Sequence, residues 1–468
     1  MSNNRFLGII PSVATILCAA PIALLQAQGN EQTAPNVLFI AIDDLRPELG
    51  AYGNKEIQSP NIDRLAADAT LFNQAYSQVP VCGASRSSML SGMLPTAKRF
   101  TAFDSRADED APGMPTLPAW FKEHGYTTYS NGKIFHNRND STDGWSRPAW
   151  MPSISHGAML NPESKKHLGG VRNRGPFYER AEVEDSAYFD GQVLDKSLAD
   201  LKELSAAGKP FFLAVGFIRP HLPFYAPAQD WDAFDEGSIS LAVNRELPAG
   251  SPESLTPSNE IQFYGDHGIP YNSELWHQTA KHGYYACVRY VDRLVGKLLD
   301  ALEATGQADN TIIVLWGDHG WLLGEHNVWG KLILLPEALR VPLLIRAPGR
   351  APAQSDEVVE AVDIYPTLCG LAGLPVPQHL QGQDLFGPSA NTGRQDSGYA
   401  YSRMFNGDAV STERYVYARY NKAGKVEELL LDREQDPLGR KNLTTDSAYA
   451  AELNTLRQAL DDQMQRAK

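Results

Sequence analysis

Cysteine is scarce in this chain, with only four in 468 residues. Cys18 lies in an apolar N-terminal stretch that we interpret as a cleaved leader, which leaves Cys82, Cys287 and Cys369. An odd number of thiols cannot form a closed set of disulfides in an oxidising compartment, so at least one is free or modified. Cys287 and Cys369 lie in helical, apolar patterns that are typical of core residues. Cys82 is the thiol that needs another explanation.

Positive charge is also in short supply. The chain has 42 Lys and Arg residues against 56 Asp and Glu residues, a formal net charge of -14. This balance argues against nucleic acid or an anionic membrane as the main partner. It does not exclude a small anionic substrate, because a local cationic pocket can outweigh the global charge. No repeat period or low-complexity tract is evident, and the length suits one large domain with a smaller one.

The N-terminus has the pattern of a secretory signal. Residues 6–25 are almost wholly apolar, they follow Arg5, and a polar stretch begins after them. A membrane anchor is the alternative, since the apolar run approaches spanning length. Pro11, Pro21 and the abrupt polar stretch favour removal. We therefore predict a signal peptide over 1–27, export to the periplasm or secretion, and a mature chain without a membrane span.

Continuous apolar runs of strand length predict strands that are buried on both faces, over 36–42, 211–217 and 311–316. Further strands are predicted over 127–130 and 341–345, and helices over 61–69, 116–124, 185–206 and 279–305. Strands that alternate with long helices indicate an α/β fold with a large mixed, mostly parallel sheet flanked by helices.

Polar residues of catalytic type follow the predicted strands where each strand ends: Asp43 and Asp44; Lys133 and His136; His221; Asp318 and His319. In an open α/β sheet, ligands bind outside the carboxyl ends of the strands. We therefore expect these side chains to converge at one edge of the sheet. The irregular segments 137–184 and 226–271 are predicted to wall the pocket there.

The sequence pattern changes near residue 398. Short runs rich in Tyr, Val and Arg over 399–404, 415–420 and 427–431 suggest an antiparallel sheet, and 449–466 reads as an amphipathic helix. We predict a catalytic domain over 34–395 and a small C-terminal subdomain of antiparallel sheet plus helix over 396–468.

Three carboxylates among the strand-end residues suit a hard metal ion. Asp43, Asp44 and Asp318 offer the oxygen ligands that calcium or magnesium prefers, and His319 could add a nitrogen. Taken alone, the Asp43–Asp44 pair is equally consistent with a loop turn or a helix cap. Its combination with a second strand that ends in Gly-Asp-His-Gly favours the metal site.

The remaining candidates are cations and imidazoles. Arg86, Lys133 and Lys331 could neutralise a tetrahedral oxyanion, although a solvated surface is the usual place for a lone lysine. His136 and His221 could transfer protons near neutral pH, although His221 in Arg-Pro-His-Leu-Pro could equally be structural.

Cys82 follows a proline turn at the predicted start of a helix, and Arg86 lies four residues later on the same helix face. The free N–H groups and the positive end of the dipole at a helix N-terminus suit an anion and an activated nucleophile. An isolated cysteine is nevertheless more often a small buried core residue.

The sequence resembles the type I, formylglycine-dependent sulfatases of the alkaline phosphatase superfamily, and within them the iduronate-2-sulfatase group. The resemblance covers nearly the whole mature length. It rests on these motifs: Asp43-Asp44, Cys82-Gly-Ala-Ser-Arg86 followed by Ser-Met-Leu-Ser-Gly, Gly132-Lys133-Ile-Phe-His136, Arg219-Pro-His221-Leu-Pro-Phe224, Trp316-Gly-Asp318-His319-Gly-Trp321-Leu-Leu-Gly-Glu325-His326, and Trp329-Gly-Lys331.

The resemblance implies an alkaline-phosphatase-like fold and conversion of Cys82 to formylglycine (3-oxoalanine) by a formylglycine-generating maturase. The hydrated aldehyde would attack sulfur beside a calcium ion, with magnesium the alternative. Residue 82 itself, Asp43, Asp44, Asp318 and His319 would hold this ion. Position 84 is Ala where many relatives have Pro, which the maturation signal tolerates.

The resemblance also assigns roles around the sulfate. A protonated His221 would help the sugar alcohol to leave, and His136 would help to expel sulfate and regenerate the aldehyde. Arg86 would steady the formylglycine, while Lys133 and Lys331 would bind sulfate oxygens.

The substrate implied is a sulfated sugar of a glycosaminoglycan or an algal polysaccharide, with Trp321 and His326 as pocket residues. Two alternatives stay open from the sequence. One is a formylglycine-dependent phosphonate monoester hydrolase or phosphodiesterase. The other is a catalytically silent sugar-binding relative with an unmodified thiol.

Overall fold

The structure, a computed structural model, describes residues 1–2, 8, 34–387 and 398–468. The chain divides into two compact units, Met1–Thr33 and Ala34–Lys468, and every element below belongs to the second. Cys18, nearly all of the predicted signal peptide over 1–27 and the predicted domain boundary at 395–396 lie outside the described residues. Among the residues that are described, no helix is long and apolar enough to cross a membrane.

An eight-stranded sheet forms the centre of this unit, in the order β10-β2-β11-β7-β1-β5-β3, with β12 paired to β2. Its strands are β1 (Asn36–Ile42), β2 (Thr70–Tyr76), β3 (Thr127–Gly132), β5 (Phe211–Phe217), β7 (Thr311–Gly317), β10 (Arg340–Val341), β11 (Leu343–Arg346) and β12 (Ala353–Glu360). The neighbours β7, β1, β5 and β3 all run parallel, whereas β11 is antiparallel to β7. The predicted mixed, mostly parallel sheet is confirmed.

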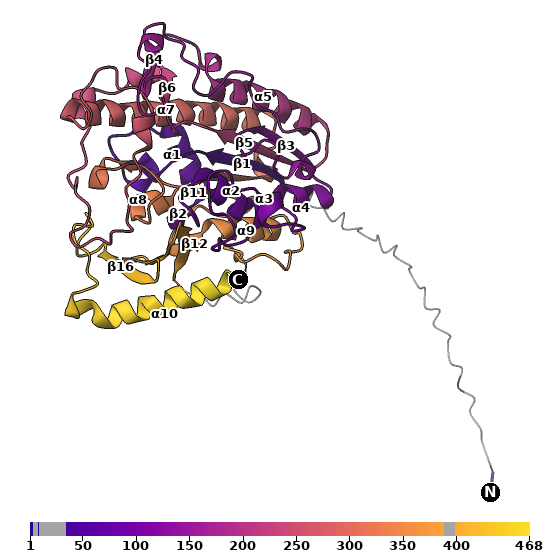
Figure 1. Ribbon diagram of the computed structural model, residues 1–468. Helices are drawn as coiled ribbons and strands as arrows, with labels where there is room; N and C mark the ends of the chain where they lie inside the picture. Colours follow the sequence, from indigo (N-terminus) through magenta and orange to yellow (C-terminus); the bar gives the residue numbers. More distant parts are fainter. Residues whose placement is uncertain (3–7, 9–33, 388–397) are drawn as a thin grey trace. The chain divides into compact units, whose positions relative to one another are not determined.

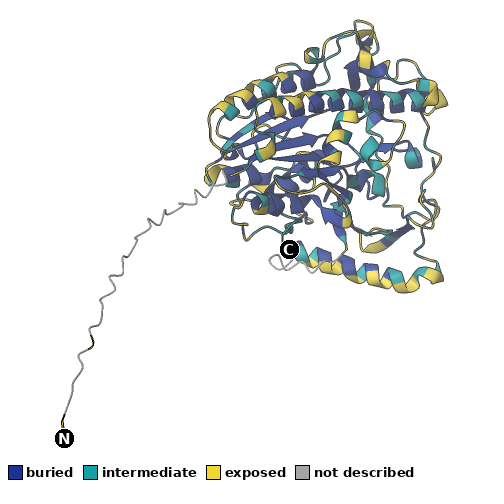
Figure 2. Ribbon diagram, turned by 180° about the vertical axis from the view of Figure 1, so that it is seen from behind, coloured by how far each residue is buried: buried dark blue, intermediate teal, exposed yellow. Residues whose placement is uncertain are grey.

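Helices cover both faces of the sheet (Figure 1). The helices α1 (Pro60–Ala67), α5 (Phe189–Ala206) and α7 (Glu274–Ala304) lie on one face, and α2 (Cys82–Ser91), α4 (Leu117–Glu123) and α9 (Ile364–Leu371) on the other. Side chains of β1 alternate between the two cores, which is why a continuous apolar run was needed there. Figure 2 shows the central strands as buried throughout.

The C-terminal part contains a separate four-stranded antiparallel sheet in the order β13-β14-β15-β16. Its strands are β13 (Ala400–Met404), β14 (Gly407–Ser411), β15 (Tyr415–Lys422) and β16 (Lys425–Asp432). The helix α10 (Ala450–Arg466) packs on it, with Leu453, Leu456 and Leu460 against Tyr417 and Leu430. The predicted antiparallel sheet and closing helix are confirmed, but the prediction missed β14, which is short and carries Gly and Asp.

Other boundaries differ from the sequence-based prediction for physical reasons. The predicted strand over 341–345 is interrupted at Pro342, which has no N–H to donate, so it forms β10 and β11. The strand β12 was not predicted because its first half is largely exposed and polar. Shorter elements complete the fold: β4 (Tyr178–Ala181), β6 (Phe224–Pro227), β8 (Leu322–Leu323), β9 (Trp329–Gly330), α3 (Ala107–Asp110), α6 (Ala228–Trp231) and α8 (Pro336–Leu339).

The N-terminus of α1 is capped from another helix. Asp292 on α7 is buried and accepts hydrogen bonds from the backbone N–H groups of Asn61 and Ile62 at 3.0 and 2.8 Å, and from Asn61 Nδ2 at 2.8 Å. We expect Asp292→Ala to lower the free energy of unfolding by about 3 kcal/mol, because one buried and two partly buried donors lose their acceptor. Denaturant unfolding measures this change.

Asp300 provides the matched control on the same helix. Its side chain is 63% exposed and pairs with Arg64 at 2.6 Å. Asp300→Ala should cost about 0.5 kcal/mol or less, since exposed ion pairs contribute little. Equal losses in the two variants would contradict the capping role of Asp292.

Candidate active site

The parallel register brings the ends of three strands to one level. Ile42 of β1 pairs with Gly317 of β7 and with Phe217 of β5. The next residues continue the ladder, since Asp318 N donates to the Ile42 carbonyl at 3.3 Å and Asp43 N to the Phe217 carbonyl at 3.1 Å. Asp43 and Asp318 therefore lie side by side at the carboxyl edge of the sheet.

Asp44 turns the chain away from β1. Its φ is 59°, in the left-handed region that Asp tolerates better than most residues. The backbone N–H groups of Asp44 and His319 both donate to Asp318 Oδ1, at 3.1 and 3.0 Å. These two bonds fix Asp318 and lock the loop after β1 to the loop after β7.

Lys133 reaches the same edge from β3. Its backbone N–H donates to the Gly216 carbonyl at 2.9 Å, across the end of β5. A Cβ atom at Gly216 would lie 2.0 Å from the Lys133 carbonyl oxygen, so only glycine permits this crossing. The Lys133 ammonium forms an ion pair with Asp43.

Cys82 is the first residue of α2, and Val81 before it is extended. The side chain is buried, with Sγ 3.3 Å from His319 Nε2 and 3.4 Å from Lys331 Nζ. A Cβ atom at Gly83 would lie 1.9 Å from the Phe103 carbonyl oxygen, so glycine lets that loop close over the start of the helix. The predicted position of Cys82 at a helix start is confirmed, and cationic groups surround its sulfur.

Three buried carboxylates face three buried cations at this edge. Lys133 pairs with Asp43, Lys331 Nζ lies 2.7 Å from Asp44 Oδ1, and Arg86 Nε lies 2.7 Å from Asp318 Oδ2. Arg86 also donates to the backbone carbonyls of Lys133 and Ile134, the latter at 3.0 Å. Each of the three carboxylates thus has a cationic side chain as its partner.

Two carboxylate oxygens in the cluster have no hydrogen-bond partner among the described residues, Asp43 Oδ1 and Asp44 Oδ2. Burial opposes the charged form of Asp43, but Lys133 and other cations outweigh it and hold the pKa of that carboxyl well below its usual range. Burial raises the pKa of the Asp44 carboxyl well above its usual range, and Lys331 does not offset it. At Asp44, unlike at Asp43, the nearby cations do not outweigh the cost of burying a charged carboxylate.

This donor set fits a hard divalent cation. Ligand atoms of Asp43, Asp44, Cys82 and His319 all lie within 4.8 Å of one another. Unpartnered carboxylate oxygens are the ligands that calcium and magnesium prefer, and the alternative of a turn or helix cap leaves them unexplained. Asp318 lies beside this group, with its oxygens engaged by Arg86 and two backbone N–H groups.

The two candidate imidazoles lie at the same edge. His221 Nε2 is 3.9 Å from Asp44 Oδ2, and its Nδ1 is bonded to the Leu222 carbonyl at 2.6 Å. Burial, reinforced by Lys331, lowers the pKa of His221 well below its usual value. Burial and Lys133 lower the pKa of His136 to about 4, and its Nδ1 has no partner among the described residues. His136 is therefore neutral at pH 7 and able to accept a proton.

Trp321 and His326 lie outside the group that surrounds Cys82. Trp321 is fully buried, and the centre of its ring lies 5.3 Å from Lys331 Nζ. His326 Nδ1 is bonded to the Glu246 carbonyl at 2.9 Å, so it secures the 244–246 segment. In this structure both side chains support their neighbours rather than face open space.

Glu260 was not predicted from the sequence as a residue of the site. Its carboxylate lies 3.6 Å from His221 Nε2 and 3.6 Å from Lys331 Nζ, with 16% of the side chain exposed. The Trp329 N–H donates to Asn259 Oδ1 at 2.9 Å and anchors the segment that carries Glu260. The only sequence signal was that this irregular segment, 226–271, was expected to wall the pocket.

The sequence of this chain matches two profiles of known protein families. The profile of the family described as Sulfatase matches residues 35–374. This chain belongs to the sulfatase family. A second profile, N-sulphoglucosamine sulphohydrolase, C-terminal, matches residues 324–466 of the sulfatase, which include its C-terminal sheet and helix.

Relatives of this sulfatase include iduronate 2-sulfatases of mouse and human. The mouse protein is 36% identical over 394 residues, which cover 75% of this chain and 71% of the relative. The human protein is 35% identical over 414 residues, which cover 77% and 74%. Among solved structures, the phosphonate monoester hydrolase of Agrobacterium radiobacter has a TM-score of 0.77 at 24% identity and covers 93% of this chain and 96% of that one. The last likeness confirms the fold.

Proposed function

We propose that this sulfatase hydrolyses an O-sulfate ester of a sulfated sugar, with an oxygen nucleophile made from Cys82. The observation that carries the proposal is the setting of Cys82 Sγ, buried between His319 and Lys331 beside two unpartnered carboxylate oxygens. A hard cation and an anion-binding pocket suit oxygen chemistry better than a thiolate. The likeness to iduronate 2-sulfatases supports a sugar substrate.

Asp43, Asp44 and His319 are the residues placed to hold a divalent cation beside position 82, with Asp318 next to them. When present, formylglycine at position 82 would supply a hydrated aldehyde as the oxygen nucleophile, and calcium, or less readily magnesium, would supply positive charge next to it. We expect Arg86 to orient this edge of the sheet, because it bonds Asp318 and two carbonyls at once.

Lys133 and Lys331 are the cations that we assign to the sulfate oxygens. Both residues are buried. Among the described residues, Lys133 has one carboxylate within 3 Å, that of Asp43, and Lys331 has one, that of Asp44. If Asp43 and Asp44 bound a divalent cation, the ammonium groups of Lys133 and Lys331 would be available to bind an anion.

His221 is our candidate for the proton donor to the departing sugar oxygen. Its Nδ1 contact with the Leu222 carbonyl orients Nε2 toward Asp44 and Glu260. Burial favours neutral His221 in the free chain, whereas negative charge from Glu260 and a bound sulfate ester favours the protonated form. The neutral His136 is our candidate for the base in the second half of the reaction.

A release assay with defined saccharides tests the proposed function. The modified chain is incubated with sulfated glycosaminoglycan and algal oligosaccharides, an aryl phosphodiester and a phosphonate monoester. We expect sulfate release from at least one saccharide to exceed hydrolysis of both phosphorus esters. The reverse order would identify a phosphonate monoester hydrolase or phosphodiesterase, and binding of a saccharide without release would identify a silent relative.

His221→Ala should affect substrates according to their leaving groups. We expect kcat on a sugar sulfate to fall about 100-fold and kcat on an aryl sulfate to fall less than about fivefold, because a phenolate leaves without protonation. Steady-state kinetics on both substrates measure the ratio. Equal losses on the two substrates would remove His221 from the role of proton donor.

The proposal also includes a partner and a location. A formylglycine-generating maturase would modify Cys82, and the predicted signal peptide would direct the chain to the periplasm or the exterior. Fractionation of expressing cells, with mass analysis of the exported chain, tests both parts: an intact N-terminus in the cytoplasmic fraction would contradict export.

A further inference from the structure

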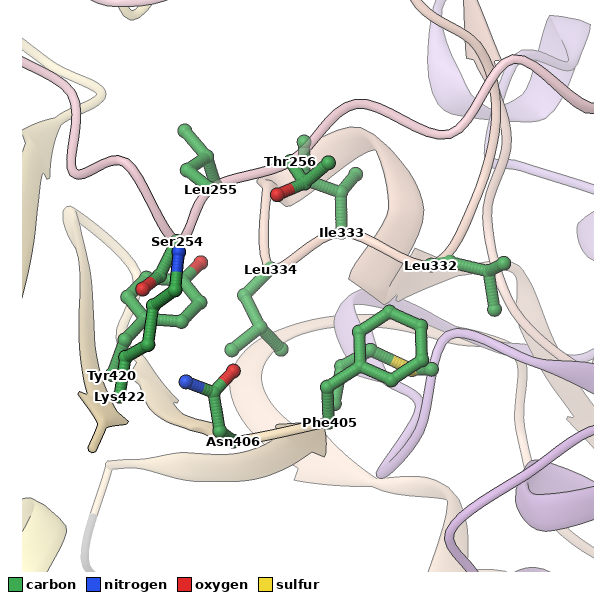
Figure 3. A pocket seen from close by; sticks show the side chains of 11 residues that line it. Ser254, Leu255, Thr256, Leu332, Ile333, Leu334, Phe405, Asn406, Tyr420 and Lys422 are labelled. Carbon is green, nitrogen blue, oxygen red and sulfur yellow. The ribbon is translucent and has the colours of Figure 1, made fainter.

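A pocket of about 490 Å³ lies where the C-terminal sheet meets the segment that follows Lys331 (Figure 3). Its lining residues come from three parts of the chain: Ser254, Leu255 and Thr256; Leu332, Ile333 and Leu334; and Met404, Phe405, Asn406, Tyr420 and Lys422. Figure 3 shows Leu332 and Phe405 toward one end, and Ser254, Tyr420 and Lys422 toward the other. The proposed chemistry around Cys82 uses none of these side chains.

Phe405, at the rim of this pocket, has an unfavourable backbone conformation. Met404 of β13 pairs with Gly407 of β14, so Phe405 and Asn406 form a two-residue hairpin turn. The φ of Phe405 is 52°, at the turn position that hairpins normally give to glycine. Its side chain is nevertheless a large ring that is 64% exposed. A strained, solvent-exposed aromatic residue points to a role outside folding.

The inner end of the pocket contains polar groups without partners. Tyr420 is 4% exposed and packs against Gly407, where a Cβ atom would lie 2.6 Å from the Tyr420 ring. Its hydroxyl, like that of Ser254, has no hydrogen-bond partner among the described residues. Unpartnered hydroxyl groups in a pocket are acceptors and donors that a polar ligand can satisfy.

The wall of the pocket is joined to the candidate active site by the backbone at Leu332. This residue directly follows Lys331, whose ammonium lies 3.4 Å from Cys82 Sγ. The Leu332 N–H donates to the Pro80 carbonyl at 3.1 Å, two residues before Cys82. Leu332 also has a positive φ, 67°, so the chain bends there to pass from the site to the pocket wall.

We propose that this pocket binds a second sugar unit of the sulfated saccharide, next to the unit whose sulfate is removed. The exposed face of Phe405 suits stacking against a sugar ring, the hydroxyl groups of Tyr420 and Ser254 suit its hydroxyl groups, and Lys422 suits a sulfate or carboxylate on it. The inference rests on the proposed function, because it extends the same substrate beyond the first sugar.

Phe405→Gly is the decisive variant, because glycine relieves the positive φ and should leave the melting temperature unchanged or higher. The probes are a tetrasaccharide and the sulfated monosaccharide of its terminal unit, both taken from the class that releases most sulfate in the screen. We expect the ratio of kcat/KM on the tetrasaccharide to kcat/KM on the monosaccharide to fall about tenfold. Lys422→Gln should lower the same ratio about threefold, more at low salt.

Val426→Ala is the matched control, since Val426 is an apolar residue of the same sheet, 56% exposed and outside the pocket. It should leave the ratio unchanged. An unchanged ratio in both Phe405→Gly and Lys422→Gln would overturn the pocket assignment while sulfate release still supported the proposed function.

If no saccharide released sulfate, the proposed function would be wrong. Calorimetry would then test separately whether the pocket binds a saccharide. The probes would then be heparan sulfate and ulvan tetrasaccharides. Binding of either by the native chain that Phe405→Gly weakens about tenfold would support a saccharide pocket. Absence of binding to both, or equal binding by the native chain and the variant, would overturn it.

Discussion

Replacement of Cys82 by alanine should lower the rate of sulfate release by about four orders of magnitude, since alanine has no thiol that a maturase could convert to the proposed aldehyde. The side chain lies at the start of α2, with its sulfur between His319 and Lys331. Loss of one small buried side chain should not unfold the protein, so the circular dichroism spectrum should match that of the native chain.

Cys287→Ala provides the matched control for Cys82→Ala. Cys287 is also buried and free, and it lies on the core-facing side of α7. Burial raises the pKa of its thiol, so it is inert at neutral pH. Its replacement should lower stability by about 1 kcal/mol and leave kcat within about twofold. Retention of more than one-hundredth of the native activity by Cys82→Ala would contradict the assignment of Cys82.

Removal of the proposed divalent cation should cause the second largest loss of activity. Exhaustive chelation should reduce activity by more than about 100-fold and lower the melting temperature, because Asp43 and Asp44 then lack the charge that their unpartnered oxygens require. Calcium should restore both properties, and magnesium should restore them less completely. Activity assays and thermal unfolding on the same samples measure the two effects.

The chelation experiment needs a check on metal content. Chelator saturated with calcium serves as the control for direct effects on the protein. Asp43→Asn adds a readout that does not depend on activity, since elemental analysis of the purified variant should show less bound calcium than the native chain. Full activity in a sample proven free of metal would refute the cation site.

Much of the fold could be predicted because its central strands are buried on both faces. The strands β1, β5 and β7 are wholly buried and therefore appear as unbroken apolar runs. The strand β12 is half exposed and β14 is short, so neither produces such a run. The pairing of β12 also depends on β2, which is far away in the sequence, whereas β14 pairs with its neighbours but carries Gly and Asp.

The same distinction applies to the site. Asp43 and Asp318 could be placed together because parallel strands end at one edge of the sheet, a rule that needs no tertiary information. Glu260 lies in an irregular segment and Phe405 in a hairpin turn. Such segments have no regular periodicity from which the direction of a side chain could be predicted. Trp321 shows the converse, since its motif predicted a pocket residue but its ring is buried beside Lys331. Its role in substrate binding stays a prediction.

The central claim is that the working group at position 82 is not a thiol. Trypsin releases this position in the peptide of residues 65–86, which contains no other cysteine. Mass spectrometry of this peptide, from active enzyme produced with a competent maturase, tests the claim directly. We expect the mass of an aldehyde or its hydrate, and no alkylation by iodoacetamide. A fully alkylatable cysteine in a sample that releases sulfate at its full rate would contradict the account.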